Sequence, residues 1–143
     1  MAQFMLALLL ATIQLPLDST DEIRFNEEAK SWIDALEHCK KNGSSLVEIT
    51  NTTTWDTVNS DLANETNKME HGAWIGLERS IFGNNGIPWR WVLNGTLKSH
   101  SCWKEGFPTD EYNHHCGKII WDETMFMLLD DDCHSKRPFI CQT

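Results

Sequence analysis

The order of patterns along the chain predicts an α+β fold. Two helical patterns come first, and short apolar strand patterns, interrupted by one long irregular segment, follow them. A chain of 143 residues has the length of a single domain. Five cysteines in a chain of this size indicate a disulfide framework, provided that the protein folds in an oxidising compartment.

The start of the chain resembles a secretory signal peptide. Its apolar run, residues 4–11, is too short to span a bilayer as a helix, so we expect no membrane insertion. No basic residue precedes the run and no clean cleavage site follows it, which leaves the start of a truncated chain as the alternative. The chain also contains four Asn-x-Ser/Thr sequons, at Asn42, Asn51, Asn64 and Asn94. We therefore expect a secreted glycoprotein, with a leader over residues 1–17 and one domain over residues 18–143.

The first helix is expected after an acidic connector over residues 18–28. Ser31 has the residue type of an N-cap, and Asp34 follows three residues later. One apolar stripe then repeats at helical spacing, made of Trp32, Ala35, Leu36 and Cys39. Asn42-Gly43 ends the pattern. Cys39 is therefore predicted on the buried face of this helix, where it can bond the element that the helix packs on.

The rest of the chain predicts one weaker helix among short strands. Leu46, Val47 and Ile49 form a strand-like run, and Trp55, Val58 and Leu62 repeat at helical spacing up to a loop around Asn64. Further strands are predicted over residues 73–77, 89–92, 117–121, 125–129 and 138–141. Turn chemistry is predicted over residues 83–88, "GNNGIP".

Two details of this region bear on function. The alternation in "WRW" puts Trp89 and Trp91 on one face of their strand and Arg90 on the other. Residues 94–115 show little periodicity, and irregular segments of that length in compact domains are usually functional or disordered. A ligand-binding surface is therefore expected in this segment.

Charge and motifs exclude several classes of function. The formal net charge of −9 argues against nucleic acid and anionic lipid as partners. No catalytic Ser/His/Asp or Cys/His motif has local context, and no Gly-rich phosphate loop follows a predicted strand. Cysteines paired in disulfides are not nucleophiles. The many carboxylates single out no acid/base pair. We do not expect an enzyme.

Four features together resemble a C-type lectin-like domain. They are the segment "FNEEAKSWIDALEHC", the run Trp74-Ile75-Gly76-Leu77, the "WRW" motif and the cysteine spacing towards the C-terminus. The match covers roughly residues 22–143. The resemblance implies the double-loop α+β fold, with two helices flanking small antiparallel sheets.

The resemblance also implies a disulfide pairing, Cys39–Cys141 and Cys116–Cys133. The count of cysteines alone does not choose it, because five cysteines with one left over allow fifteen arrangements. Cys102 is the remaining cysteine, unpaired or intermolecular. We take a disulfide-linked dimer through Cys102 as the hypothesis, with a buried free thiol or another in-chain pairing as the alternative.

The residues of the family's calcium site are mostly replaced here. In sugar-binding members, a calcium ion in the long loop is held by a Glu-Pro-Asn or Gln-Pro-Asp tripeptide, an acidic residue before the third framework cysteine, and an Asn-Asp pair before the fourth. The corresponding residues in this chain are Phe107, Thr109, His114, Leu129 and Asp130. Calcium prefers carboxylate and carbonyl oxygens, which phenylalanine, histidine and leucine side chains lack. Only Asp130 matches, so the usual calcium-dependent sugar site is predicted to be lost and no cofactor is expected.

Two other metal sites are conceivable from residue types, and the sequence favours neither. A rearranged cation site would need the triplet Asp130-Asp131-Asp132 together with Asp110 and Glu111, but adjacent aspartates cannot all converge on one ion. We favour a solvated acidic turn between two strands. A zinc site would draw on His100, His114, His115 and His134. Zinc ligands need fixed spacing and second-shell support, and the side chains of adjacent histidines in an extended segment point apart.

The expected function is non-catalytic recognition of a protein or carbohydrate ligand through the long-loop surface, without the usual calcium site. The candidate ligand surface contains Trp103, Phe107, Tyr112 and Asp130. Trp103 stands at a position that belongs to the core of the loop in this family, so the alternative is that its side chain is buried and does not contact a ligand. The alternative functions are a calcium-dependent lectin with non-standard ligands and a structural or ice-binding role, which this fold also hosts.

Overall fold

The computed structural model describes residues 22–79, 89–98 and 102–143. The predicted leader, the predicted turn at residues 83–88 and His100 lie outside these ranges. The elements follow in the order β1 (Ile23–Lys30), α2 (Trp32–Lys41), β2 (Ser45–Leu46), α3 (Thr52–Asp61), the 3-10 helix η2 (Ala63–Lys68), β3 (Ala73–Arg79), β4 (Trp89–Trp91), β5 (Gly95–Thr96), β6 (Cys116–Asp122), β7 (Met125–Asp131) and β8 (Arg137–Gln142).

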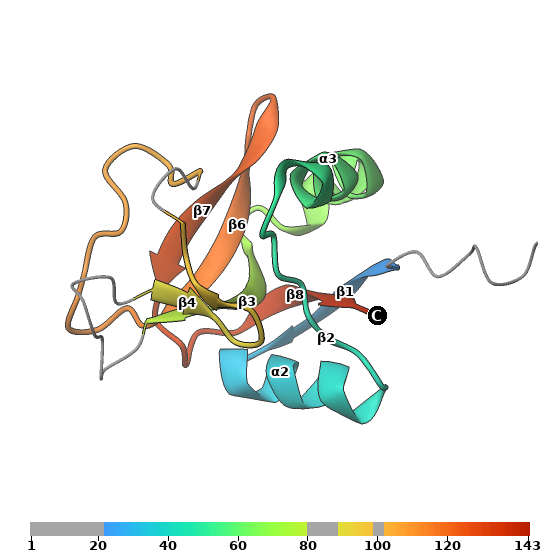
Figure 1. Ribbon diagram of the computed structural model, residues 1–143, viewed down its shortest axis with the longest axis horizontal. Helices are drawn as coiled ribbons and strands as arrows, with labels where there is room; N and C mark the ends of the chain where they lie inside the picture. The colour runs from blue at the N-terminus through green and yellow to red at the C-terminus, as the bar shows by residue number, and fades with distance from the viewer. Residues whose placement is uncertain (1–21, 80–88, 99–101) are drawn as a thin grey trace, which may run out of the picture.

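The strands form one mixed sheet whose main path runs β1-β8-β3-β4-β5. β2 pairs with β8, and β6 leaves the path by pairing with both β3 and β7. All these pairings are antiparallel except that of β3 with β8. In Figure 1 the β6–β7 hairpin rises from the sheet beside α3, whereas α2 lies below β1 and β8. The α+β class predicted from the sequence is confirmed.

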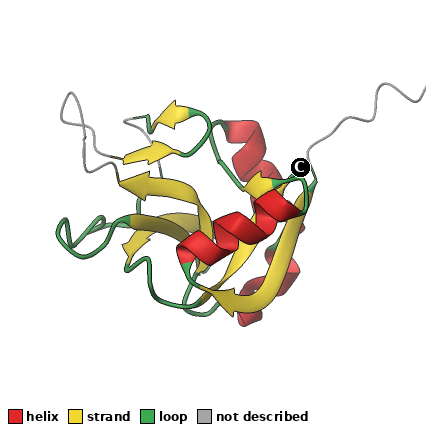
Figure 2. Cartoon of the chain, turned by 90° about the horizontal axis from the view of Figure 1, so that it is seen from below, coloured by secondary structure: helices red, strands yellow, loops and turns green. Residues whose placement is uncertain are grey.

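Each helix covers its own part of the core. α2 packs through Trp32, Ala35 and Cys39 against Trp74 of β3 and Phe139 of β8. α3 contributes Val58 to a second and larger cluster, which includes side chains of β3, β4, β6, β7 and β8. Figure 2 shows the helices at separate places on the strands. Both helices therefore bury one apolar stripe, as their residue spacing predicts.

The first helix forms as the sequence predicts. The Ser31 Oγ atom accepts a hydrogen bond from the Asp34 backbone N–H at 3.3 Å, and the helix ends before Asn42. Cys39 is completely buried and forms a disulfide with Cys141. The Trp32 indole N–H donates to the Ile75 carbonyl oxygen at 2.9 Å, so the helix is also held to β3 by a polar contact.

The predicted connector over residues 18–28 is wrong in its described part. Residues Ile23–Lys30 form strand β1, which pairs antiparallel with β8. Ile23 and Phe25 alternate with polar residues and pack against the core, which is the pattern of a half-buried strand. Glu27 and Glu28 of this strand are exposed, and these acidic residues made the short alternation hard to recognise in the sequence.

Two other segments are more ordered than the sequence indicates. Asn64 lies in the 3-10 helix η2 and not in a loop. The irregular segment 94–115 contains the two-residue strand β5 and an isolated bridge between Trp103 and Leu128. The predicted arrangement of the "WRW" motif is confirmed, because Trp89 and Trp91 are buried and Arg90 between them is exposed.

Gly76 lets β3 lie close to the strand-like segment before α3. A Cβ atom at this position would lie 2.9 Å from the Leu46 carbonyl oxygen and 3.2 Å from that of Val47. The Gly76 N–H donates to the Val47 carbonyl oxygen at 2.8 Å, and its own carbonyl accepts from the Val92 N–H at 3.0 Å. The glycine of the Trp-Ile-Gly-Leu run is therefore required by a close backbone approach.

Two opposite ends of the domain can be distinguished. The start of β1 and the C-terminus lie side by side, where the Thr143 N–H donates to the Glu22 carbonyl oxygen at 3.1 Å. Residues 102–115, which precede β6, lie at the opposite end of the molecule (Figure 1). Within the described part of the chain, every helix is too short or too polar to cross a membrane.

Candidate functional site

The long loop, defined here as residues 102–115, is attached to the edge of strand β7. The Leu128 N–H donates to the Cys102 carbonyl oxygen at 2.8 Å, and the Lys104 N–H donates to the Leu128 carbonyl oxygen at 3.0 Å. The base of the loop is thus fixed by backbone hydrogen bonds. Its remaining residues, beyond Lys104, lie at the end of the molecule opposite the C-terminus (Figure 1).

The Trp103 side chain packs against the core rather than projecting into solvent. It is half-buried and packs against the core, edge-to-face with Trp89 at 5.1 Å between ring centroids. Phe107 is also half-buried. Tyr112 is 80% exposed, so of the three aromatic candidates it alone presents most of its side chain to solvent. Of the aromatic residues predicted for the ligand surface, Trp103 and Phe107 are therefore only partly exposed.

The Asp130 carboxylate forms the hydrogen bonds that hold the middle of the long loop. Its side chain is fully buried at the end of β7. Its two carboxylate oxygens accept from the Thr109 backbone N–H at 3.0 and 2.9 Å, and one of them accepts from the Asp110 N–H at 3.0 Å. The Thr109 hydroxyl lies 3.2 Å from both oxygens. The predicted place of Asp130 on the ligand surface is thus wrong, because its carboxylate is used inside the loop.

A histidine and a second aspartate complete this arrangement. The His114 Nδ1 atom lies 3.2 Å from the Asp130 carboxylate. The Asp110 carboxylate accepts from the backbone N–H groups of Tyr112 and Asn113, both at 3.1 Å, and from the Asn113 side-chain amide at 3.0 Å. The Asn113 amide, followed by these backbone donors, lowers the pKa of Asp110. Tyr112 therefore projects from a turn that is closed by a charged carboxylate.

The residues at the family's calcium positions do not fit a calcium ion. Calcium takes about six to eight oxygen ligands. Here Phe107 and Leu129 have no side-chain oxygen, and Leu129 is buried, 7% exposed. The Thr109 hydroxyl and the Asp130 carboxylate contact each other, and His114 brings a nitrogen atom to the same carboxylate. The structure brings Thr109, His114 and Asp130 together as a hydrogen-bonded group.

The three consecutive aspartates contact three different sets of partners. Asp131 is 8% exposed and receives the Lys118 ammonium at 2.8 Å and the Arg137 Nε atom at 3.0 Å. The Asp132 carboxylate accepts from the His134 N–H at 2.9 Å. The predicted solvated acidic turn is therefore wrong for Asp130 and Asp131, which are buried residues of β7. No three His, Cys, Asp or Glu side chains of the described residues are placed to hold a metal ion.

A cavity of about 500 Å³ lies beside the long loop. It is lined by Arg79 and Trp89 together with residues 108–112. We call it the loop cavity. The Arg79 guanidinium lies over the Trp89 ring, 5.0 Å from its centroid. Tyr112, the exposed aromatic residue of the loop, stands at this cavity.

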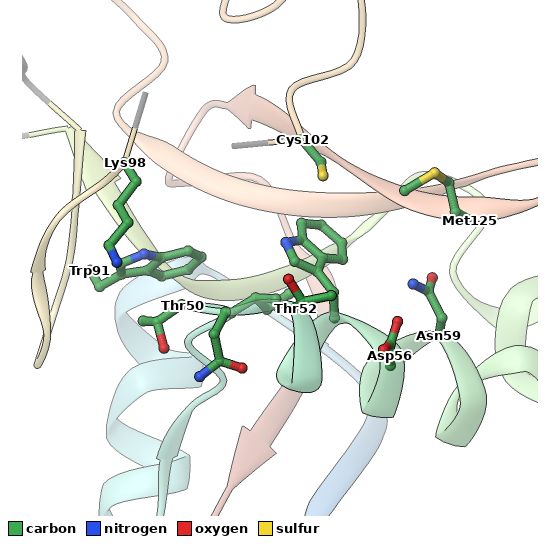
Figure 3. Close-up of a pocket in the computed structure, with 11 residues that line it drawn as sticks. Thr50, Thr52, Asp56, Asn59, Trp91, Lys98, Cys102 and Met125 are labelled. Atoms are coloured by element: carbon green, nitrogen blue, oxygen red, sulfur yellow. The ribbon is translucent and has the colours of Figure 1, made fainter. Parts of the chain in front are cut away.

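A second cavity, of about 390 Å³, lies between α3 and the start of the long loop. Cys102, which has no disulfide partner and is half-buried, lines it. Figure 3 shows the Cys102 sulfur directed towards this cavity, with Asp56 and Asn59 on the α3 side. Trp91 and Lys98 lie at its other end (Figure 3).

Sequence reasoning missed two charged residues, Glu48 at the turn after β4 and Arg79 at the loop cavity. Glu48 is 5% exposed, and its carboxylate accepts from the backbone N–H groups of Leu93 at 2.7 Å and Asn94 at 2.9 Å, which fixes the turn after β4. A carboxylate within the apolar run "LVEI" was the available signal. Arg79 gave no such signal, because its position over Trp89 depends on the pairing of β3 with β4.

The sheet, the two disulfides and the long loop attached to β7 define the class: this is a C-type lectin fold. The family described as "Lectin C-type domain" matches residues 28–143, and the chain belongs to this family. Perlucin-like protein of Mytilus galloprovincialis is 30% identical over 120 residues, which cover 82% of this chain and 72% of that protein. Salivary C-type lectin 2 of Aedes albopictus is 26% identical over 140 residues, covering 93% and 90%. The structure of human lithostathine has a TM-score of 0.70 and 25% identity, covering 85% of this chain and 90% of that one.

We expect Asp130→Asn to loosen the long loop without unfolding the domain. The amide has a single acceptor oxygen, so it cannot accept from all of the donors that Thr109 and Asp110 now direct at the two carboxylate oxygens. Buried donors left unpaired cost about 1–3 kcal/mol. Hydrogen exchange of the Thr109 and Asp110 amides should accelerate, together with a lower melting temperature. Glu111→Gln, an exposed change in the same loop, is the control. Unchanged exchange rates in Asp130→Asn would contradict the role assigned to this carboxylate.

Proposed function

We propose that this domain is a non-catalytic recognition module that binds a carbohydrate or protein ligand through the long-loop surface without calcium. The observation that carries the proposal is the use of Asp130 inside the protein. Its carboxylate accepts hydrogen bonds from Thr109 and Asp110, so the loop is held by groups of the chain itself. A loop held in this way needs no ion to keep its shape.

The surface around the loop has the chemistry of a recognition site. Tyr112 is exposed, and the loop cavity beside it combines an arginine, an indole ring and carboxylates. Aromatic faces and fixed polar groups are the usual components of ligand-binding surfaces. A relative, the salivary protein of Aedes albopictus, carries the name of a lectin, which supports a carbohydrate as ligand.

The alternative is a calcium-dependent lectin with non-standard ligands. It would require Asp131 or Asp132 to turn towards Asp110 and Glu111. Asp131 is held by Lys118 and Arg137, and losing both contacts to bind an ion would leave two cations unpaired. This cost favours binding without calcium.

One experiment separates the two proposals. Binding of the purified protein to a glycan array is measured with calcium and with excess chelator, and melting temperature is followed in a calcium titration. We expect the same glycans to be bound under both conditions, and a melting temperature that calcium does not change. Binding that chelator abolishes would overturn the proposal in favour of the calcium-dependent alternative.

We also propose that Cys102 links two copies of the protein. It is half-exposed, and Cys39, Cys116, Cys133 and Cys141 are paired with one another. An odd thiol in an oxidising compartment pairs with a second chain when it is accessible. Non-reducing electrophoresis should show a dimer that dithiothreitol converts to monomer and that Cys102→Ser lacks. A single monomer band for the wild-type protein without reductant would refute the dimer.

We infer that the protein is secreted and glycosylated. Two disulfides are typical of oxidising compartments, and the sequon asparagines Asn42, Asn51, Asn64 and Asn94 are all exposed. Treatment of protein from culture medium with an N-glycosidase should increase its electrophoretic mobility. Protein that stays inside the cell, or mobility that does not change, would contradict this inference.

A further inference from the structure

Two buried hydrogen-bond donors beside the loop cavity have no acceptor. Trp89 is 4% exposed, and its indole Nε1 atom has no partner among the described residues. The Nε atom of Arg79, whose guanidinium lies over the Trp89 ring, is likewise buried and unpaired. Buried donors are almost always hydrogen-bonded in native proteins, so two of them beside one cavity require an explanation.

The positive charge of Arg79 is also uncompensated. No carboxylate of the described residues lies within ion-pair distance of its guanidinium, although Glu78, the preceding residue, pairs with Arg90 at 3.9 Å. Of the residues outside the described part, 80–88 and 99–101 contain no aspartate or glutamate, whereas 1–21 contain Asp18 and Asp21. The carboxylates lining the loop cavity are Asp110 and Glu111, and that of Asp110 already accepts from Tyr112 and Asn113. Among the described residues, the Arg79 guanidinium at this cavity therefore has no paired anion.

The contacts that hold the Arg79 guanidinium favour binding of an anionic group. Stacking on Trp89, which itself packs edge-to-face on Trp103, restricts the plane of the guanidinium. A guanidinium fixed in this way loses less freedom on forming a paired hydrogen bond, and its fork of N–H groups matches the oxygens of a carboxylate or sulfate. Glu111, which also lines the cavity, is exposed and can accept hydrogen bonds from sugar hydroxyls.

We propose that the loop cavity binds an acidic sugar, with its carboxylate or sulfate group on Arg79 and its hydroxyls towards Glu111 and Tyr112. The inference rests on the proposed function, because it names the class of glycan that the long-loop surface recognises. The ligand carries few charges: a polyanion would meet Asp110 and Glu111 in the cavity and a chain of net charge −9 around it.

The test compares matched glycans on one array, in chelator and at fixed salt. Each backbone is printed in a neutral, a sialylated and a sulfated form, and the best set is then titrated in solution. We expect the acidic forms to bind about tenfold or more tightly than the neutral form, as a charge-assisted arginine contact supplies. The stronger of the two acidic forms identifies carboxylate or sulfate as the preferred group.

Variants of Arg79 test whether this residue causes the preference for acidic glycans. Arg79→Gln should reduce binding of the acidic forms to the level of the neutral form, while Arg79→Lys should retain part of the preference because it keeps the charge without the fork. Arg90→Gln, an exposed arginine on β4, is the matched control and should retain the full preference. Melting temperatures of all variants verify folding.

Three results would overturn the inference: equal binding of the three forms, a preference that survives in Arg79→Gln, or no glycan bound at all. Equal binding without calcium leaves the proposed function intact. Binding that disappears in chelator overturns the proposed function itself, so the two failures are distinguishable.

Discussion

Replacing Cys39 and Cys141 together with alanine is expected to lower the free energy of unfolding by about 4.7 kcal/mol, by loop-closure entropy. The two cysteines are 102 residues apart, so their disulfide closes almost the whole domain and joins α2 to β8. Loss of this link lets the unfolded chain explore many more conformations. Denaturant titration of the double variant and the wild-type protein measures the difference.

The second disulfide is the internal control for this prediction. Cys116 and Cys133 are only 17 residues apart, and the same relation assigns their link about 3 kcal/mol. The Cys116→Ala and Cys133→Ala double variant should therefore be the more stable of the two. Equal losses, or the reverse order, would show that local packing rather than loop length determines the contribution of each disulfide.

Asp131→Asn is expected to destabilise the domain by about 3 kcal/mol or more, the cost of breaking a buried charge pair. The Asp131 carboxylate accepts from Lys118 and Arg137, and Lys118 is only 9% exposed. Removing the negative charge leaves both cations facing each other across a buried site. Chemical denaturation measures the loss, and Asp132→Asn, next along the chain but half-exposed, should change stability far less.

The pH dependence of this pair follows from the pKa of Asp131. Burial alone would raise the pKa, but the hydrogen bonds and charges of Lys118 and Arg137 outweigh burial and hold it below its ordinary value. A carboxyl group with a lowered folded-state pKa stabilises the protein above its unfolded-state pKa of about 4, and this contribution disappears as pH falls through the folded-state pKa. The difference in stability between wild type and Asp131→Asn should thus be full near neutral pH and shrink below about pH 4. A difference that stays constant down to pH 2 would refute the assignment to the Asp131 charge.

Local sequence patterns predicted the helices and strands in which apolar residues recur at a regular spacing. Helix α2 was readable because an N-cap and an apolar stripe coincide within ten residues. The alternation of Trp89, Arg90 and Trp91 likewise indicated a strand with one buried face. Strand β1 was missed because its partner, β8, lies at the other end of the chain, and acidic residues dominate its local composition.

The sequence predicted where the candidate site lies but not which contacts its side chains make. The absence of periodicity over residues 94–115 located the long loop, and the replaced calcium positions were visible as residue types. Residue types did not indicate that Asp130 would be buried and bound to Thr109, or that Trp103 would pack on Trp89. Each of these contacts joins residues that are more than ten positions apart in the chain.

The sequence by itself determined the class of fold, the first helix and the residue types at the family's calcium positions, and its resemblance to the family implied which cysteine is left over. Only the tertiary structure decided which carboxylates are buried, which aromatic side chain is exposed, and that Arg79 stands unpaired over Trp89 beside the loop cavity. The physical reason is that periodicity and capping act between neighbours in the chain, whereas burial and charge pairing depend on strands that the fold brings together from distant positions.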